Sequence, residues 1–415
     1  MEMEEEYWTD YGEVKDVYEV KETDKKIRVI GIGGGGGNTV NSLYDKLNKH
    51  ELKIPSESIE FSVINSDSQD LAKSPIPDKI QIAEDGQGAG SDPELGKKFA
   101  TENSKRIKDS LKNAYLIFIT AGMGGGTGTG AAPVVARLAR EENPNALVVG
   151  VVTTPFSSDR NIQKTDLANS GIEAMKKEVN ALIIVSNDSI MEVFKKKGDE
   201  CIPAIDCKKA FRATDTVLIN AITGIVGIIK NVGSQNADFR DIYNIMKNAG
   251  TDVIIGVGSA TGPEKYKNAL DDALNSPLLC GRTIDGAKGI IVNFCTAVDK
   301  SDINGVNYVR NTIYGMADPK ANYKDCITED PNLKDSLILT VIATDFVDER
   351  GELVTHMMRV AEAHGIKTSR SRKNFFKKEN EEKKKKDLFQ EIILPNFEEP
   401  TFMRMKRSSH NADNT

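Results

Sequence analysis

The stretch YLIFITAGMGGGTGTGAAP, residues 115–133, decides the fold, because an apolar strand runs directly into a cluster of glycines and threonines. Glycine reaches positive φ and carries no Cβ, so consecutive backbone N–H groups can turn inward around an anion. The good helix former AAPVVARLAR follows, and a helix N-terminus favours negative charge. The stretch predicts a phosphate cradle between a strand and a helix, whereas a plain glycine hinge would need neither neighbour.

The same alternation extends to both sides of this stretch. Apolar strands are expected at residues 27–32, 59–67, 115–120, 146–154 and 181–187, with amphipathic helices at 38–49, 93–112, 129–142 and 161–178. Strands that are apolar throughout and alternate with helices predict a parallel sheet covered on both faces. Ligands of such sheets bind outside the carboxyl ends of the strands.

Two further glycine loops and a polar segment fall at those ends. GIGGGGGN (31–38) contains GxGxxG, so an NAD-dependent oxidoreductase is one alternative; INSDSQ (64–69) and GQGAGSDPELG (86–96) follow it. Three glycine loops exceed what one pyrophosphate needs and suit a triphosphate. The P-loop motif GxxxxGK[ST], with its phosphate-binding lysine, is absent. Backbone amides and Mg²⁺ must therefore neutralise the phosphate charge. With four histidines and no CxxC pair among five cysteines, no metal site made by the protein alone is expected.

This order of motifs resembles the tubulin superfamily, and within it the FtsZ family of cell-division GTPases. GGGTGTG (124–130) resembles the signature loop, INSDSQ resembles INTDAQ, VVTTPF (151–156) resembles VVTKPF, and SNDSI (186–190) resembles PNDKL. The resemblance spans roughly residues 26–346 and implies GTP and GDP as ligands, with Mg²⁺ held mainly by the nucleotide phosphates. The implied GTP-binding residues are Gly34, Gly35, Gly36, Gly37, Asn38, Asn65, Asp67, Gly88, Ala89, Gly90, Gly124, Gly125, Gly126, Thr127, Gly128, Thr129, Pro155, Asp159, Gln163, Asn187, Phe211 and Asp215.

Base recognition is expected in AFRATDTVL, residues 210–218. Phe211 and Asp215 are four apart and share one face of a helix. The resemblance implies that the ring stacks on guanine and that the carboxylate accepts hydrogen bonds from its N1 and N2 donors. The alternative is a core phenylalanine and a surface aspartate.

The segment NADFRDI, residues 236–242, carries the expected catalytic acids. Asp238 and Asp241 follow a long helix, and ~16 residues at ~1.5 Å each place them roughly 24 Å from the base-binding face. The resemblance implies that Asn236, Asp238 and Asp241 act on the nucleotide of the next subunit. An N-cap or a solvated turn is the ordinary alternative, and capping is compatible with catalysis.

The domain plan follows from composition and from the resemblance. The expected fold is α/β and tubulin/FtsZ-like, with a parallel Rossmann-like nucleotide-binding sheet, a long central helix and a smaller α+β domain with a mixed sheet. The expected divisions are an acidic extension (1–25), a GTP-binding domain (26–207), the central helix (208–232), the C-terminal domain (233–347), a charged linker (348–387), a partner-binding peptide (388–407) and a disordered end (408–415).

The tail suggests the partners. Pro400, Phe402, Met403 and Arg404 resemble the terminal peptide, with a PAFLR-like core, through which the family binds membrane tethers and division regulators. The alternative is a terminal segment that packs on its own domain. The net charge of −7 argues against direct nucleic-acid binding, and no window has the apolar length of a transmembrane segment, so a cytoplasmic protein is expected. The resemblance implies that it acts at the midcell division site.

The leading hypothesis is a GTPase that assembles head to tail into a homopolymer, organises the division ring and hydrolyses GTP at the interface between subunits. The alternative within the superfamily is a filament for DNA segregation, shape control or regulatory scaffolding. Two positions depart from the family pattern: Gln163 replaces an arginine that commonly contacts phosphate, and Asp159 replaces a glutamate that meets the ribose. The third glycine loop is about three residues shorter than usual, so slower hydrolysis is one expected consequence.

Overall fold

The computed structural model describes residues 26–49, 59–156, 162–188, 207–230, 235, 238–247, 251–279, 282–330 and 333–346. Its N-terminal half is a six-stranded parallel sheet in the order β3-β2-β1-β4-β5-β6. This confirms the predicted parallel sheet. The strands are β1 (Lys26–Ile32), β2 (Ile59–Asn65), β3 (Asp78–Gln81), β4 (Ala114–Gly122), β5 (Leu147–Thr154) and β6 (Ala181–Ser186).

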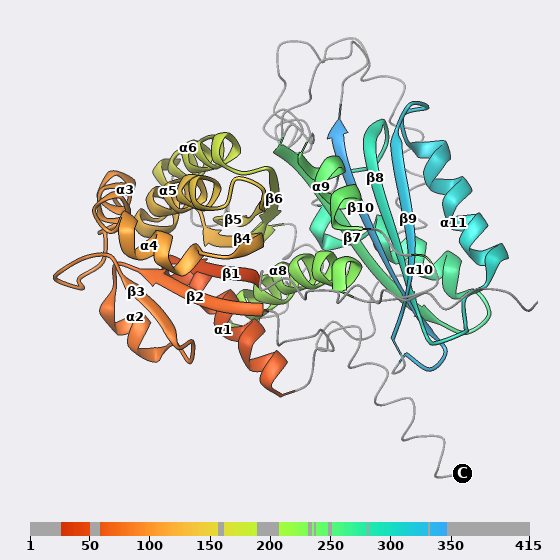
Figure 1. Cartoon of the computed structure of the whole chain (residues 1–415), viewed down its shortest axis with the longest axis horizontal. Helices are drawn as coiled ribbons and strands as arrows, with labels where there is room; N and C mark the ends of the chain where they lie inside the picture. The colour runs from red at the N-terminus through yellow and green to blue at the C-terminus, as the bar shows by residue number, and fades with distance from the viewer. Residues whose placement is uncertain are drawn as a thin grey trace, which may run out of the picture.

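Helices cover both faces of this sheet (Figure 1). They are α1 (Gly33–Asn48), α2 (Ser68–Lys73), α3 (Pro93–Glu102), α4 (Ser104–Leu111), α5 (Gly126–Glu142) and α6 (Ile162–Glu178). Side chains alternate along each strand. Val29 of β1 therefore faces the core that includes Val40 of α1, whereas Ile30 faces the core that includes Val135 of α5.

Several helix boundaries differ from the sequence prediction. The prediction of a single helix over 93–112 is wrong, because the helix is interrupted at Asn103. The side-chain amide of Asn103 donates to the carbonyls of Ile82 and Phe99. The helices expected from residues 38 and 129 begin earlier, at Gly33 and Gly126. Glycine is a poor helix former, so the prediction started each helix after the glycines, whereas tertiary packing makes the glycines part of it.

The C-terminal half is a mixed four-stranded sheet, as predicted, in the order β7-β10-β8-β9. The β7/β10 and β10/β8 pairs are antiparallel and the β8/β9 pair is parallel. Its elements are α9 (Phe239–Lys247), β7 (Thr251–Thr261), α10 (Lys265–Leu274), a 3-10 turn (Pro277–Leu279), β8 (Ala287–Thr296), α11 (Ile303–Met316), β9 (Asn322–Glu329) and β10 (Ser336–Phe346).

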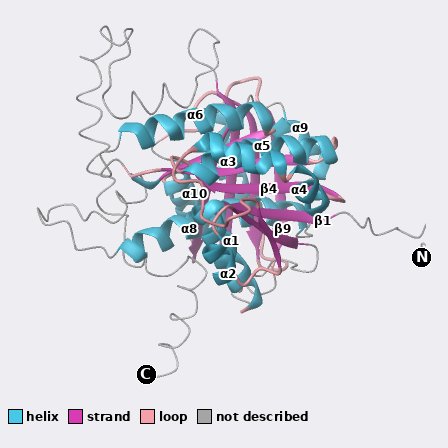
Figure 2. Cartoon of the chain, turned by 90° about the vertical axis from the view of Figure 1, so that its left-hand side faces the viewer, coloured by secondary structure: helices cyan, strands magenta, loops and turns pink. Residues whose placement is uncertain are grey.

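Helix α8 (Cys207–Lys230) joins the two halves and lies between them (Figure 1). Its Val217, Ile222 and Val226 share one core with Val149 of β5 and Ile255 of β7. The two sheets also meet directly, since Ala181 of β6 pairs in parallel with Thr251 of β7. Viewed from the end of the first domain, α5 and α6 lie above its strands and α1 and α2 lie below them (Figure 2).

Candidate functional site

Two helices start at the carboxyl ends of neighbouring strands. Helix α1 begins directly after β1, and α5 begins a few residues after β4. Neither N-cap residue, Ile32 or Gly125, caps its helix with a side chain, whereas aspartates cap α2, α3 and α11. The first N–H groups of a helix have no intrahelical partner. The starts of α1 and α5 therefore present uncapped donors on one edge of the sheet, as the predicted phosphate cradle requires.

The glycines at this edge are of two kinds. At Gly36, a Cβ would lie 2.1 Å from the carbonyl oxygen of Thr120, so only glycine lets α1 approach β4. At Gly125, Gly88 and Gly90 an added Cβ would meet nothing within 4 Å. Gly36 thus allows close packing of α1 on β4, whereas Gly88, Gly90 and Gly125 border open space. This arrangement fits a ligand with several phosphates better than it fits a closed turn.

Side-chain contacts hold the loops in place. The hydroxyls of Ser66 and Thr127 are 2.6 Å apart, and the Thr129 hydroxyl accepts a hydrogen bond from the N–H of Gly124 at 2.9 Å. The buried Asn65 accepts from the N–H of Asp67 at 3.3 Å, and Asp67 itself caps α2. Each of these predicted ligand residues thus has a structural partner as well. The sequence prediction missed Ser66, although it lies inside the INSDSQ segment.

The base-recognition end is marked by Asp215 of α8. Its carboxylate accepts a hydrogen bond from the Thr39 hydroxyl of α1 at 2.8 Å. Burial raises the pKa of Asp215 to about 6, and the hydrogen bond from Thr39 acts in the opposite direction. One residue earlier, the Thr214 hydroxyl donates to Asn187 Oδ1 at 3.2 Å. These two contacts tie α8 to the second turn of α1 and to the residue after β6, and sequence reasoning had not identified either threonine.

Other predicted site residues are distributed as follows. Pro155 lies beside Gly124, whose added Cβ would be 3.4 Å from the proline Cγ. Gln163 is exposed near the start of α6. Asp159, Asn236, the side chain of Phe211, and Pro400, Phe402, Met403 and Arg404 lie outside the described residues.

Asp238 and Asp241 lie near the amino ends of the strands, at the edge of the sheet opposite the glycine loops. Phe239, next to Asp238, packs edge-on against Tyr115 with ring centroids 5.1 Å apart. Tyr115 is at the amino end of β4, whereas Gly122 ends the same strand. At ~3.3 Å per residue, the strand separates them by about 23 Å. The exposed Asp238 is therefore far from the glycine loops of its own chain.

The acids also make local contacts. Asp238 accepts a hydrogen bond from the N–H of Asp241 at 2.7 Å and so caps α9, as the alternative interpretation predicted. The Asp241 carboxylate forms an ion pair with Lys324 Nζ of β9 at 2.6 Å. Capping uses one oxygen of Asp238 and leaves its exposure to solvent intact.

Comparison with known proteins agrees with this geometry. Residues 26–195 match the model of the tubulin/FtsZ family GTPase domain, and residues 251–347 match the FtsZ family C-terminal domain. An empty FtsZ dimer from M. jannaschii is 34% identical over 78% of this chain and 89% of that chain, with a TM-score of 0.67. The chain belongs to the tubulin/FtsZ family.

Two solved structures with a more distant sequence share the fold. The GDP-bound monomer of CetZ1 from Haloferax volcanii is 20% identical, over 82% of this chain and 98% of that chain, with a TM-score of 0.64. The GTPγS-bound protofilament of CetZ2 from the same organism is 20% identical, over 81% and 98%, with a TM-score of 0.63. The family match makes residues 26–195 a GTPase domain, and the dinucleotide oxidoreductase alternative is no longer needed.

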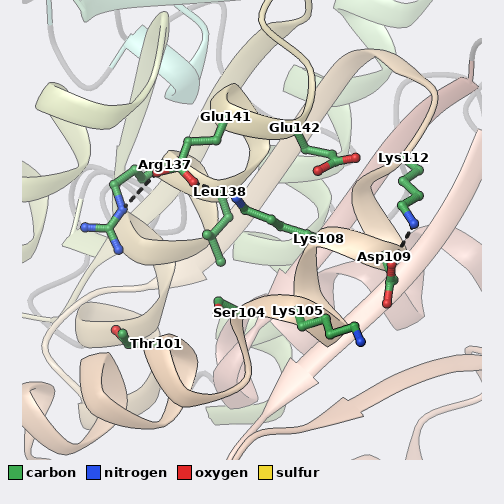
Figure 3. Close-up of a pocket in the computed structure, with 10 residues that line it drawn as sticks. All are labelled: Thr101, Ser104, Lys105, Lys108, Asp109, Lys112, Arg137, Leu138, Glu141 and Glu142. Atoms are coloured by element: carbon green, nitrogen blue, oxygen red, sulfur yellow. Dashed lines mark hydrogen bonds and ion pairs between the residues drawn. The ribbon is translucent and has the colours of Figure 1, made fainter.

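A separate hollow of this tubulin/FtsZ domain lies between α4 and the C-terminal half of α5 (Figure 3). Lys108 pairs with Glu141 at 2.8 Å, Lys112 with Asp109 at 2.7 Å, and Arg137 with Glu141 at 3.6 Å. The lining is a mixed-charge surface whose cations are mostly paired, at the far end of α5 from Gly126.

Among the described residues, no helix is long and apolar enough to cross a bilayer, and no group of three His, Cys, Asp or Glu side chains could hold a metal.

Proposed function

We propose that this GTPase assembles head to tail into filaments that organise the cell-division ring, and that each subunit's nucleotide is hydrolysed with help from the next subunit. The observation that carries the proposal is the contact between Phe239 and Tyr115. It supports an acidic loop, formed by Asp238 with Asp241 in the first turn of α9, near the amino ends of the strands and a phosphate cradle at their carboxyl ends. A surface that meets a different surface on the next copy generates an open filament or a ring.

Nucleotide binding in this proposal uses the chain's own donors and acceptors. The uncapped N–H groups at the starts of α1 and α5, together with the half-buried Thr127, contact the phosphates. The Asp215 carboxylate accepts from N1–H and N2–H of guanine, whereas adenine presents an acceptor at N1 and is rejected. Mg²⁺ would neutralise phosphate charge and would be held mainly by phosphate oxygens, since the described residues form no carboxylate cluster of their own.

Hydrolysis requires a water aligned with the γ-phosphate. In the proposed filament, Asp238 and Asp241 of one subunit, with Asn236, polarise the water that attacks the neighbour's nucleotide. A carboxylate that accepts a proton from this water contributes to general base catalysis. A lone subunit then binds GTP and turns it over slowly, because its own acids lie near the amino end of β4, about 23 Å along the strand from the glycine loops.

Mixing two inactive variants tests this arrangement. Asp238→Asn keeps the cradle but lacks the acid, and Gly125→Val keeps the acid but fills the open space of the cradle. An equal mixture should release phosphate much faster than the sum of the separate variants, because the cradle of one meets the loop of the other. Rates that merely add would contradict the proposal.

The division role rests on the C-terminal peptide with Pro400, Phe402, Met403 and Arg404 and its resemblance to a tether-binding motif. Partners of this peptide would be a membrane tether and division regulators, with the filament in the cytoplasm at midcell. Deletion of residues 388–415 should leave assembly and phosphate release unchanged and abolish localisation to the septum. A full-length protein that never concentrates at midcell would favour the alternative, a filament with a non-division task.

A further inference from the structure

Strand β9 is paired with Gln235, which lies between α8 and Asp238 in the sequence. Gln235 and Ile327 exchange two backbone hydrogen bonds, with Ile327 N to Gln235 O at 2.7 Å and Gln235 N to Ile327 O at 3.3 Å. The Gln235 side chain also donates to the backbone carbonyl of Asp325 at 3.2 Å, and the Asp325 carboxylate pairs with Arg310 of α11. The chain is therefore anchored to β9 three residues before Asp238.

A second anchor lies just after Asp238. Lys324 Nζ of β9 contacts Asp241 Oδ2 at 2.6 Å, and Asp241 donates its backbone N–H to Asp238 Oδ1 at 2.7 Å. Lys324 shares a face of β9 with Cys326, which is buried in the core that also contains Ile242 of α9. The hydrogen bond and the charge of Asp241 raise the pKa of Lys324, and Asp238 adds a smaller contribution of the same sign.

The two acids thus differ in what they contact. The side chain of Asp241 faces a cation of its own subunit and is 37% exposed, whereas Asp238 is exposed and meets the start of α9 through one oxygen. The Asp238 carboxylate accepts a hydrogen bond from the backbone N–H of Asp241. A shift of Asp241 therefore also shifts the Asp238 carboxylate.

We propose that Lys324 is a positioning residue for hydrolysis: it fixes Asp241 to β9 and thereby sets the direction in which Asp238 faces the neighbouring subunit. This inference rests on the proposed function, in which Asp238 acts at the interface between subunits. It gives Asp241 a second part besides its proposed action on the water, because the backbone N–H of Asp241 donates the hydrogen bond that Asp238 accepts. An error of about 1 Å in the position of a reacting group can cost roughly a hundredfold in rate.

The test compares Lys324→Met, Lys324→Arg and the control Lys320→Met, which removes a lysine from the exposed turn just before β9. Three quantities are measured on the full chain: GTP affinity below the assembly threshold, the threshold itself with GTPγS, and phosphate release per assembled subunit with GTP. Lys324→Met should leave GTP affinity unchanged and raise the threshold by no more than about fivefold, the scale of a partly exposed ion pair. Phosphate release per assembled subunit should fall by about tenfold or more, Lys324→Arg should restore most of it, and Lys320→Met should match the parent.

A double-mutant cycle with Asp241→Asn identifies the route of the effect. If Lys324 acts through Asp241, Lys324→Met should add little to the threshold change that Asp241→Asn already causes. Fully additive threshold changes, or parental phosphate release by assembled Lys324→Met, would overturn the inference. A parent protein whose turnover per subunit does not depend on concentration would instead overturn the proposed function, so the two failures are distinguishable.

Discussion

Phe239 packs edge-on against Tyr115, with an angle of 87° between the rings, at the amino end of β4. Lys230, the last residue of α8, lies over the same tyrosine ring at 5.8 Å. One aromatic side chain of the first sheet thus contacts both the end of the central helix and the start of α9. Asp238, the residue before Phe239, therefore lies near the amino end of β4, opposite the glycine loops.

Asp238→Asn should separate assembly from hydrolysis. Asparagine caps a helix about as well as aspartate, so α9 should remain folded. Loss of the carboxylate should lower phosphate release by roughly a hundredfold or more, the usual contribution of a general base. Sedimentation with GTP and phosphate release on the same samples provide the measurement, and normal release by sedimented filaments would contradict the assignment.

A matched pair of glycine substitutions should distinguish packing from binding. Gly36→Ala places a Cβ 2.1 Å from the Thr120 carbonyl oxygen, so overpacking should lower the free energy of unfolding by about 1–3 kcal/mol or more. Gly125→Ala meets nothing within 4 Å and should unfold like the parent, yet bind GTP more weakly because its methyl group enters the cradle. Thermal unfolding without nucleotide and GTP titration measure the two effects. Equal GTP affinity of Gly125→Ala and the parent would place the phosphates elsewhere.

Asp215 should make both stability and GTP binding depend on pH. Its pKa of about 6 in the folded chain is above the ordinary value, so the folded state binds the proton more tightly than the unfolded state. The stabilisation that comes from keeping Asp215 protonated in the folded chain is therefore present below about pH 4 and is lost as the pH rises to about 6. Asp215→Asn should raise the free energy of unfolding of the nucleotide-free protein by at most about 3 kcal/mol at pH 7.5 and leave it nearly unchanged at pH 4.

Ionisation of the same carboxyl group lowers the stability of the folded chain but should raise its affinity for guanine. Only the ionised form accepts both guanine donors, so GTP affinity should fall below pH 6 by about tenfold per pH unit. Thr39→Val removes a donor that favours the ionised form and should move this midpoint to higher pH. A titration of GTP affinity from pH 5 to pH 8 measures both effects, and a parental affinity that does not change below pH 6 would argue against a role of Asp215 in base recognition.

The contact between the two aromatic rings should matter for turnover and not for binding. Phe239→Ala removes the packing that holds α9 against β4, and phosphate release per assembled subunit should fall severalfold. GTP affinity should be unchanged, because the cradle lies on the other edge. Tyr115→Phe preserves the ring and is the control, expected to match the parent. A loss of GTP affinity in Phe239→Ala would show that the two edges are not independent.

Much of this arrangement was predictable because the sequence pattern is local. The apolar strand before Gly122 and the helix after Gly126 are adjacent in sequence, and their order predicted the parallel sheet correctly. The cradle stays a prediction, and the uncapped starts of α1 and α5 lie where it was expected. The early start of α1 was not predictable, because it depends on Gly36 meeting the backbone of Thr120 in a distant strand. Strand β9 was missed because its sequence NYKDCITE contains several polar residues, and its place in the sheet depends on pairing with β8.

Contacts between distant elements were the part of the site that the sequence could not supply. Thr39 and Asp215 are 176 residues apart, and no local pattern links them. The pair of Asp241 and Lys324 likewise joins α9 to a strand that the sequence analysis had not identified. By contrast, the capping by Asp238 was anticipated, since an aspartate just before an amphipathic segment is a common N-cap.

The most direct test of the central claim is phosphate release per subunit, measured over a range of protein concentrations at saturating GTP and Mg²⁺. The arrangement of cradle and acidic loop on opposite edges predicts a rate near zero at low concentration and a steep rise above the assembly threshold. A rate per subunit that is the same in dilute and concentrated protein would contradict it.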